Sequence, residues 1–185
     1  MMNTTETILA LLESVERKGV TELIEWLTHS DYFTAPASTV YHLNREGGLA
    51  QHSLNVYYTL QNLNEVYGLN LKEDTMIFTA LLHDVCKVNL YKPNILKSGQ
   101  QSTAKPYEHD DQLPLGHAEK SLAILNKIIE LTEQEQMMIR WHMGTFDKAF
   151  FTYQKTILDK FPECLAMFMA DWTASVYVDT KKEEE

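Results

Sequence analysis

The chain contains very little cysteine. Cys86 and Cys164 are the two cysteines among its 185 residues, and they do not form a Cys-x-x-Cys pair. Two cysteines are too few for a disulfide framework, and the missing spacing excludes the common cysteine-based zinc sites. We therefore expect a protein of a reducing compartment, and we predict a cytoplasmic location.

Long hydrophobic runs are also missing. The longest apolar stretch, Cys164 to Ala170, is far shorter than the about 20 residues needed to cross a bilayer. The first residues contain no basic segment followed by an apolar one, so we expect no secretory signal. With 44% hydrophobic and 23% charged residues, the composition is typical of a globular domain in water, and no membrane partner is predicted.

Positive charge is scarce as well. The sequence has 16 Lys and Arg residues against 26 Asp and Glu residues, which gives a net charge of −10 and argues against binding to duplex nucleic acid. One segment, 87–107, instead contains lysines and no acidic residue. Its lysines are Lys87, Lys92, Lys97 and Lys105. The segment is either a solvated loop or, if it lies over a binding site, a surface that attracts a small anionic substrate.

Several common catalytic motifs do not occur in the chain. It has no Gly-rich phosphate loop, no Gly-x-Ser-x-Gly sequence and no His-Glu-x-x-His sequence. P-loop nucleotide hydrolysis, serine hydrolysis by a nucleophile elbow and zincin chemistry therefore lack their residues.

The hydrophobic pattern predicts an all-α fold, and 185 residues are enough for one sizeable core. We expect a single domain over 1–180, with an N-terminal helical extension at 1–35, a core at 40–178 that contains the candidate functional residues described below, and a disordered tail at 181–185. The expected helices include 49–67, 72–86, 115–131 and 132–142, and a last helix that ends near 178. The capping box Thr132-Glu133-Gln134-Glu135 marks the start of one of them.

The segment 88–116 is too long for a structureless connection inside a compact bundle. Val88-Asn89-Leu90-Tyr91, followed by a polar turn around Gly99, favours a short β-hairpin. We expect this hairpin between the fourth and fifth helices, lying over the functional site.

The dipeptide His83-Asp84 follows the apolar run Phe78 to Leu82. Burial of a carboxylate and an imidazole at this position costs on the order of several kcal/mol. A nearby cation, such as a metal ion, compensates this cost. Lys87 follows at a spacing that brings its ammonium to the same side. The dipeptide therefore predicts a metal site whose other ligands lie elsewhere in the chain.

Four further residues are candidate ligands, and each has an alternative. His52 alone is more typical of a hydrogen-bonded, half-buried histidine, and His142 fits a helix C-terminus equally well. His117 fits the first turn of a helix. Asp171 is different, because it interrupts an apolar helix beside the small residues Ala170 and Ala174 and needs a cation from elsewhere.

The ordered set His52, His83-Asp84 and Asp171 resembles the pattern H…HD…D of the HD-domain metal-dependent phosphohydrolases. The local string His83-Asp84-Val85-Cys86-Lys87 is similar to the family's HD[IV]xK, and the resemblance spans about 40–178. His117 and His142 look like the two extra histidines of the subgroup that holds two metals. The resemblance implies that His52, His83, Asp84 and Asp171 hold one ion, and that Asp84 bridges to a second ion held by His117 and His142.

The resemblance also implies an activity. It indicates hydrolysis of a phosphate monoester or diester of a small molecule, foremost a nucleotide, with divalent transition metals drawn from Mn, Fe, Co, Ni and Zn. Asp84 and Lys87 are the expected catalytic residues. Lys87, Arg45 and Asp147 are the expected substrate contacts, although a surface salt bridge or a helix cap explains Arg45 and Asp147 equally well.

Two other functions remain open. Some proteins of this type use a di-iron centre to activate dioxygen, so an oxygenase is one alternative. A non-catalytic nucleotide or metal sensor is another. The intact ligand set together with Lys87 favours catalysis. The sequence does not indicate an oligomeric state.

Overall fold

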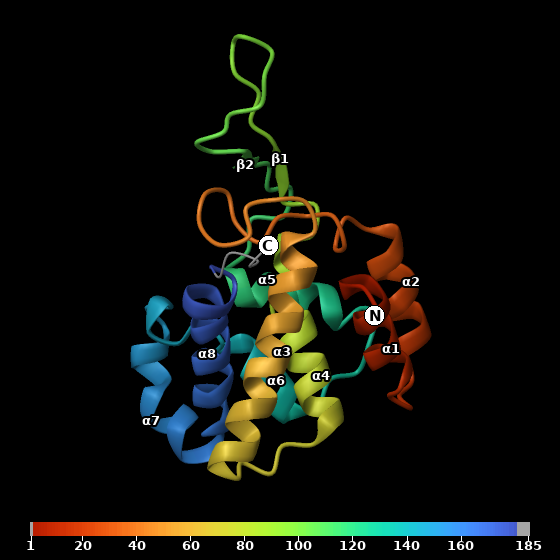
Figure 1. Ribbon diagram of the computed structural model, residues 1–185. Helices are drawn as coiled ribbons and strands as arrows, with labels where there is room; N and C mark the ends of the chain where they lie inside the picture. Colours follow the sequence, from red (N-terminus) through yellow and green to blue (C-terminus); the bar gives the residue numbers. More distant parts are fainter. Residues whose placement is uncertain (1, 181–185) are drawn as a thin grey trace.

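The computed structural model describes residues 2–180 and forms a helical bundle with one two-stranded antiparallel sheet (Figure 1). This confirms the predicted all-α fold with a hairpin between the fourth and fifth helices. The tail predicted at 181–185 lies outside the described residues. The elements are, in order, α1 (Thr4–Glu13), α2 (Val20–His29), α3 (Gly48–Tyr67), α4 (Glu73–Leu82), η1 (Val85–Lys87), β1 (Tyr91–Pro93), β2 (Tyr107–His109), α5 (His117–Leu125), α6 (Glu133–Arg140), η2 (Gly144–Phe146), α7 (Phe150–Lys160), α8 (Glu163–Thr173) and η3 (Ala174–Val178).

The long helix α3 organises the bundle. It packs against α1, α4 and α8, and Figure 1 shows it running through the middle of the molecule. In α4, every residue from Thr75 to Leu82 is buried, which explains why its sequence is apolar almost all round. The apolar core extends from α1 to α8, so the N-terminal helices share it. No helix within residues 2–180 combines the length and apolarity required to cross a membrane.

The fourth helix ends earlier than the sequence predicted. Instead of continuing to residue 86, it stops at Leu82; Asp84 leaves helical geometry with φ −105° and ψ 17°, and the short 3₁₀ turn η1 follows. Ser121 stabilises this end, because its hydroxyl donates to the His83 carbonyl at 2.6 Å and accepts from the Cys86 amide at 3.1 Å. The irregular turn, and not helical spacing, therefore sets the directions of the His83 and Asp84 side chains.

Two glycines bring the preceding loop against the start of α3. A Cβ atom at Gly48 would lie 2.0 Å from the Leu43 carbonyl oxygen and 2.9 Å from the Ala37 amide nitrogen, so only glycine permits this approach. Gly47 has φ 73°, in the left-handed region. As a result His42 lies beside His52, with ring centroids 4.9 Å apart.

The hairpin was predicted to lie over the functional site, but the structure places its loop elsewhere (Figure 1). Strands β1 and β2 pair antiparallel with Tyr91 opposite His109, and the connecting loop projects away from the bundle (Figure 1). Lys92 lies on this hairpin and pairs with Glu108 at 3.5 Å. The lysines of the hairpin therefore face solvent and neighbouring acidic residues.

The ion pair between Arg17 and Glu135 ties the N-terminal segment to α6. The guanidinium donates to both carboxylate oxygens, at 2.7 and 2.9 Å, and stacks on the Phe78 ring at 4.2 Å from its centroid. The Glu135 side chain is fully buried and also accepts from the Thr132 amide, which completes the predicted capping box. One carboxylate thus stabilises both a helix start and a contact between distant segments.

We expect Glu135→Ala to lower the free energy of unfolding by about 3 kcal/mol, because it leaves Arg17 without its buried partner. This value is at the lower end for a broken buried ion pair, since Arg17 keeps some access to water. Urea unfolding followed by circular dichroism measures the change. The matched control is Glu133→Ala, an exposed residue of the same helix turn, which should change stability by less than about 1 kcal/mol. Equal effects of the two substitutions would contradict the role given to Glu135.

Candidate metal centre

All six predicted ligands lie together at one end of the bundle. His52 comes from the second turn of α3, and His83 and Asp84 follow the end of α4. The remaining three are His117 at the start of α5, His142 just after α6, and Asp171 in α8. Because these elements are far apart in the sequence, the tertiary fold and not local structure assembles the cluster.

One group of side chains surrounds the Oδ2 atom of Asp84. The Nε2 atom of His83 lies 3.4 Å from it and that of His52 lies 3.7 Å from it. His52 Nε2 also lies 3.1 Å from Asp171 Oδ1. Ligand atoms bound to one ion at about 2.1 Å lie roughly 3.0 to 3.4 Å apart, so this group is close to the spacing that a metal requires.

A second group faces the other oxygen of the same carboxylate. His117 Nε2 lies 2.7 Å from Asp84 Oδ1, and His142 Nε2 lies 3.7 Å from it. The thiol of Cys86 lies 3.5 Å from His117 Nδ1. The two oxygens of Asp84 therefore face two different sets of histidines, an arrangement suited to a bridging carboxylate.

The histidine rings are oriented as metal ligands usually are. Nδ1 of His83 lies 2.8 Å from the Ala80 carbonyl, and Nδ1 of His142 lies 2.7 Å from the Ile139 carbonyl. Each Nδ1–H thus donates to the backbone, which leaves the Nε2 lone pair directed into the cluster. Within residues 2–180, both Nε2 atoms are buried without a hydrogen-bond partner. The donor set, imidazoles mixed with carboxylates, fits a divalent transition metal.

Asp84 forms a close ion pair with Lys87 within the cluster. Its side chain is 3% exposed, and Lys87 Nζ lies 2.6 Å from Oδ2. Burial opposes ionisation, but the positive charge of Lys87 and the charge and hydrogen bond of His117 outweigh it and hold the pKa of Asp84 well below its usual range. Burial also opposes the charge on Lys87, yet Asp84 raises the pKa of that ammonium. The pair is therefore ionised at neutral pH.

The histidines differ in how readily they hold a proton. Burial disfavours the charged ring of His52, but hydrogen bonds to Asp171 and Asp179 raise its pKa to about 9. Burial likewise opposes charge on His117, but Asp84 raises its pKa to about 10. Burial and the neighbouring His83 lower the pKa of His142 to about 3. His142 is thus neutral at pH 7, as a metal ligand must be.

Sequence reasoning missed a layer of residues behind His52. Asp179 Oδ2 lies 2.7 Å from His52 Nδ1, and Asn55 donates to Asp179 Oδ1 at 2.7 Å. His42 also belongs to this layer, with its Nε2 atom 3.9 Å from Asp179 Oδ2. No sequence motif includes Asp179. The only feature that distinguishes it in the sequence is its position eight residues after Asp171.

Five of the six candidate ligands, all but His83, line a cavity of about 1060 Å³. Its lining also includes apolar and aromatic residues, among them Tyr41, Phe146, Phe168 and Trp172. The ring of Trp172 has its centroid 5.2 Å from Phe146 and 5.4 Å from Phe168. A Cβ atom at Gly144 would lie 2.5 Å from the Phe168 ring, so this glycine allows η2 to approach α8.

The predicted substrate contacts are only partly found at this cavity. Lys87 lines it, whereas Arg45 and Asp147 are not among its lining residues. Arg45 is exposed, and Asp147 accepts from Arg140 at 2.6 Å and from the Ala149 amide at 2.8 Å. Burial opposes ionisation of Asp147, but the bond with Arg140 lowers its pKa. The salt-bridge and helix-cap alternative therefore describes the contacts of Asp147.

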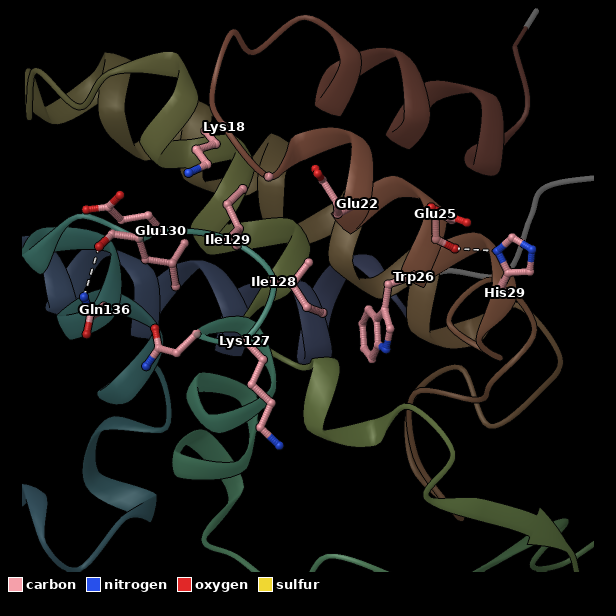
Figure 2. Close-up of a pocket in the computed structure, with 13 residues that line it drawn as sticks. Lys18, Glu22, Glu25, Trp26, His29, Lys127, Ile128, Ile129, Glu130 and Gln136 are labelled. Carbon is pink, nitrogen blue, oxygen red and sulfur yellow. Dashed lines mark hydrogen bonds between the residues drawn. The ribbon is translucent and has the colours of Figure 1, made fainter.

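A second cavity, of about 900 Å³, lies between α2 and the connection from α5 to α6 (Figure 2). Trp26 and Ile128 form its apolar part, and Lys18, Lys127 and Glu22 are among the charged residues around them. None of the six predicted ligands lines it. The chemistry-bearing residues therefore gather at the first cavity.

Comparison with known proteins agrees with this geometry. A family model for the HD domain matches residues 49–175. The chain is also similar to the dihydroneopterin 2',3'-cyclic phosphate phosphodiesterase of Methanocaldococcus jannaschii, with 36% identity over 97 residues. This match covers 50% of the chain and 36% of the archaeal enzyme, so the chain spans about a third of that relative's length.

No solved structure matches the chain. The matched segment nevertheless contains all six residues of the cluster, in the order that the sequence resemblance required. It also covers more than half of the chain. The chain therefore belongs to the HD domain family.

Proposed function

We propose that the chain is a metal-dependent phosphohydrolase that cleaves a phosphate ester of a small molecule with a planar heterocycle, such as a nucleotide. The observation that carries the proposal is the position of Asp84, whose two oxygens face two separate groups of histidines. The archaeal relative, which by its name acts on a cyclic phosphate diester, supports the same reaction class.

The residues divide naturally between two ions. His52, His83 and Asp171 would hold the first ion with Asp84 Oδ2, and His117 and His142 would hold the second with Asp84 Oδ1. A bound divalent metal supplies Lewis acidity, which lowers the pKa of water and stabilises charge on phosphoryl oxygens. The Nε2 atoms of His83 and His142, which are buried without a hydrogen-bond partner, would gain one in this arrangement.

Lys87 supplies the positive charge that a phosphoryl group needs. Its side chain is 11% exposed and lines the cavity beside Asp84. With three donors, the ammonium can contact Asp84 and a substrate oxygen together. A charged donor aimed at developing negative charge stabilises the transition state, and the small exposed fraction of Lys87 strengthens this effect.

The aromatic side chains that line the cavity suit the organic part of the substrate. Trp172 is 49% exposed and Phe146 is 61% exposed, although both lie against other rings. Half-exposed rings at a cavity that also holds Lys87 offer a stacking surface next to a phosphate site. A nucleobase or a pterin has the flat shape and the size to use it.

The direct test is a screen of phosphate esters with Mn, Co, Fe, Ni and Zn supplied in turn. We expect hydrolysis of nucleotide monoesters or cyclic diesters with at least one of these metals. Iron-loaded protein assayed with and without dioxygen separates a hydrolase from the oxygenase alternative. A protein that binds nucleotides and metal but releases no product in any of these assays would instead be a sensor.

The first prediction from this function concerns the number of ions. The double variant His117→Ala/His142→Ala should lose one metal equivalent and keep the other, because His52, His83 and Asp171 remain. Metal analysis of the purified protein measures this. Asp84→Ala is the reference variant, and it should lose both ions because its carboxylate serves both groups. Full metal content in the double variant would mean that the two histidines are not ligands.

The second prediction concerns Lys87. Lys87→Ala should keep its metal and fold but lose about 10² to 10³ in turnover, because one charged donor at the reacting phosphoryl group is removed. Lys87→Arg should recover only part of the rate, since the planar guanidinium does not match a point charge. Lys92→Ala is the matched control, because Lys92 lies on the solvated hairpin. Parent turnover in Lys87→Ala would remove Lys87 from the mechanism.

The third prediction concerns Trp172. Trp172→Ala should raise the KM for a nucleoside 2',3'-cyclic phosphate about 10-fold or more, since stacking of a base is worth about 1 to 3 kcal/mol. The KM for a ribose cyclic phosphate that lacks the base should not change. Trp26→Phe, in the second cavity, is the control. Equal losses on both substrates would show that Trp172 shapes the cavity without stacking on a base.

A further inference from the structure

His52 is anchored differently from the other buried histidines of the cluster. His83 and His142 donate from Nδ1 to backbone carbonyls, whereas Nδ1 of His52 lies 2.7 Å from a carboxylate oxygen of Asp179. The side chain of Asp179 is fully buried. A charge-assisted hydrogen bond of this kind holds a ring more firmly than a neutral one.

The carboxylate of Asp179 is itself held in place. Its other oxygen accepts from Nδ2 of Asn55, which lies one turn after His52 on α3. Asn55 is oriented in turn, because its Oδ1 accepts from Gln51 Nε2 at 2.9 Å. Two donors from one helix thus meet the two oxygens of Asp179, an arrangement that an amide at position 179 cannot reproduce.

A π-helical turn brings Asp179 to this position. After α8 the chain continues as η3, and the amide of Asp179 donates to the Ala174 carbonyl at 2.9 Å, five residues earlier. Such wide turns are frequent at functional sites. Asp171, before the π turn, and Asp179, after it, contact opposite nitrogens of the His52 ring.

We propose that Asp179 is a positioning residue for metal binding, which holds the proton on Nδ1 of His52 so that Nε2 faces Asp171 and Asp84. This inference rests on the metal centre in the proposed function. Asp179 lies outside residues 49–175, the part of the chain that the HD domain model covers. The turn after α8 thus supplies a contact that the family model does not include.

An alternative is that His42, His52 and Asp179 themselves hold an ion, since their ligand atoms lie within 4.8 Å of one another. A neutral imidazole has a free lone pair on only one of its two ring nitrogens. If Nδ1 of His52 bound an ion together with Asp179, Nε2 would carry the proton and could not bind an ion beside Asp84 and Asp171. His42 Nε2 lies 3.9 Å from the Asp179 carboxylate, and the His42→Ala variant described below tests this alternative directly.

The test measures metal affinity by competition with a chelator, so it needs no substrate. Asp179→Asn should bind metal about 10-fold to 100-fold more weakly, the usual effect of losing a partner behind a ligand. The double variant Asp179→Asn/Asn55→Asp should regain part of this loss, because the carboxylate introduced at position 55 accepts from the amide introduced at position 179, whose oxygen is then free for His52. Asp159→Asn, an exposed carboxylate of α7, is the matched control and should bind as the parent does.

A second measurement uses the unmodified, zinc-loaded protein. In ¹⁵N-labelled protein, NMR should show the Nδ1–H proton of His52 as a protected, downfield signal, with the metal on Nε2. Parent affinity in Asp179→Asn, or a His52 ring that lacks this proton, would overturn the proposal. So would the loss of a metal equivalent in His42→Ala, because Asp179 would then be a ligand and not an anchor. Absence of phosphate-ester hydrolysis by the unmodified protein would contradict only the proposed function, because the chelator and NMR measurements need no substrate.

Discussion

The buried carboxylate of Asp84 is the constraint on which the functional end of the molecule depends. A carboxylate that is 3% exposed is costly unless cations or strong donors surround it, and here they approach from two sides. Lys87 and the first group of histidines face one oxygen, and His117 and His142 face the other. The helix ends around it are therefore arranged by electrostatics as much as by packing.

The backbone meets this constraint by stopping α4 early. A helix continued through Asp84 would fix the angle between neighbouring side chains at about 100°. Instead, the chain turns at Asp84, and Ser121 of α5 bonds to the backbone groups freed at the helix end. The same hydroxyl thereby links the dipeptide to the helix that begins with His117, so the two groups of ligands are joined through one side chain.

The sequence predicted the parts of the site that chemistry marks strongly. Histidines and aspartates in apolar helices have few structural reasons to be there, so His83, Asp84 and Asp171 were recognisable as candidate ligands. The ordered pattern of the family then indicated His52, His117 and His142. Family membership followed from the same ordered pattern and the helical fold from the hydrophobic pattern, and both are confirmed. The ligand roles themselves remain predictions, although the six side chains do lie together.

The remaining features depend on tertiary contacts that have no local signal. Asp179 matters because a π turn carries it back to His52, and no periodicity of the sequence encodes that turn. Nothing in the sequence distinguishes Trp172 and Phe146 from other apolar residues. Only in the folded chain do η2 and α8 bring their rings together. The lysines of the hairpin fitted either a solvated loop or a surface for an anionic substrate, and only the folded structure shows that Lys92 has the acidic neighbours Glu108 and Asp110.

The cluster also links metal binding to folding. His83 and His142 lie with ring centroids 4.8 Å apart, and within the described residues both Nε2 atoms are buried without a hydrogen-bond partner. Buried polar atoms without partners lower stability by about 1 to 3 kcal/mol each. An ion bound to these atoms removes that cost and stabilises only the folded chain, because the ligands come from five separate helical segments and meet only there. With a metal bound, its affinity and the stability of the fold would therefore depend on the same buried atoms.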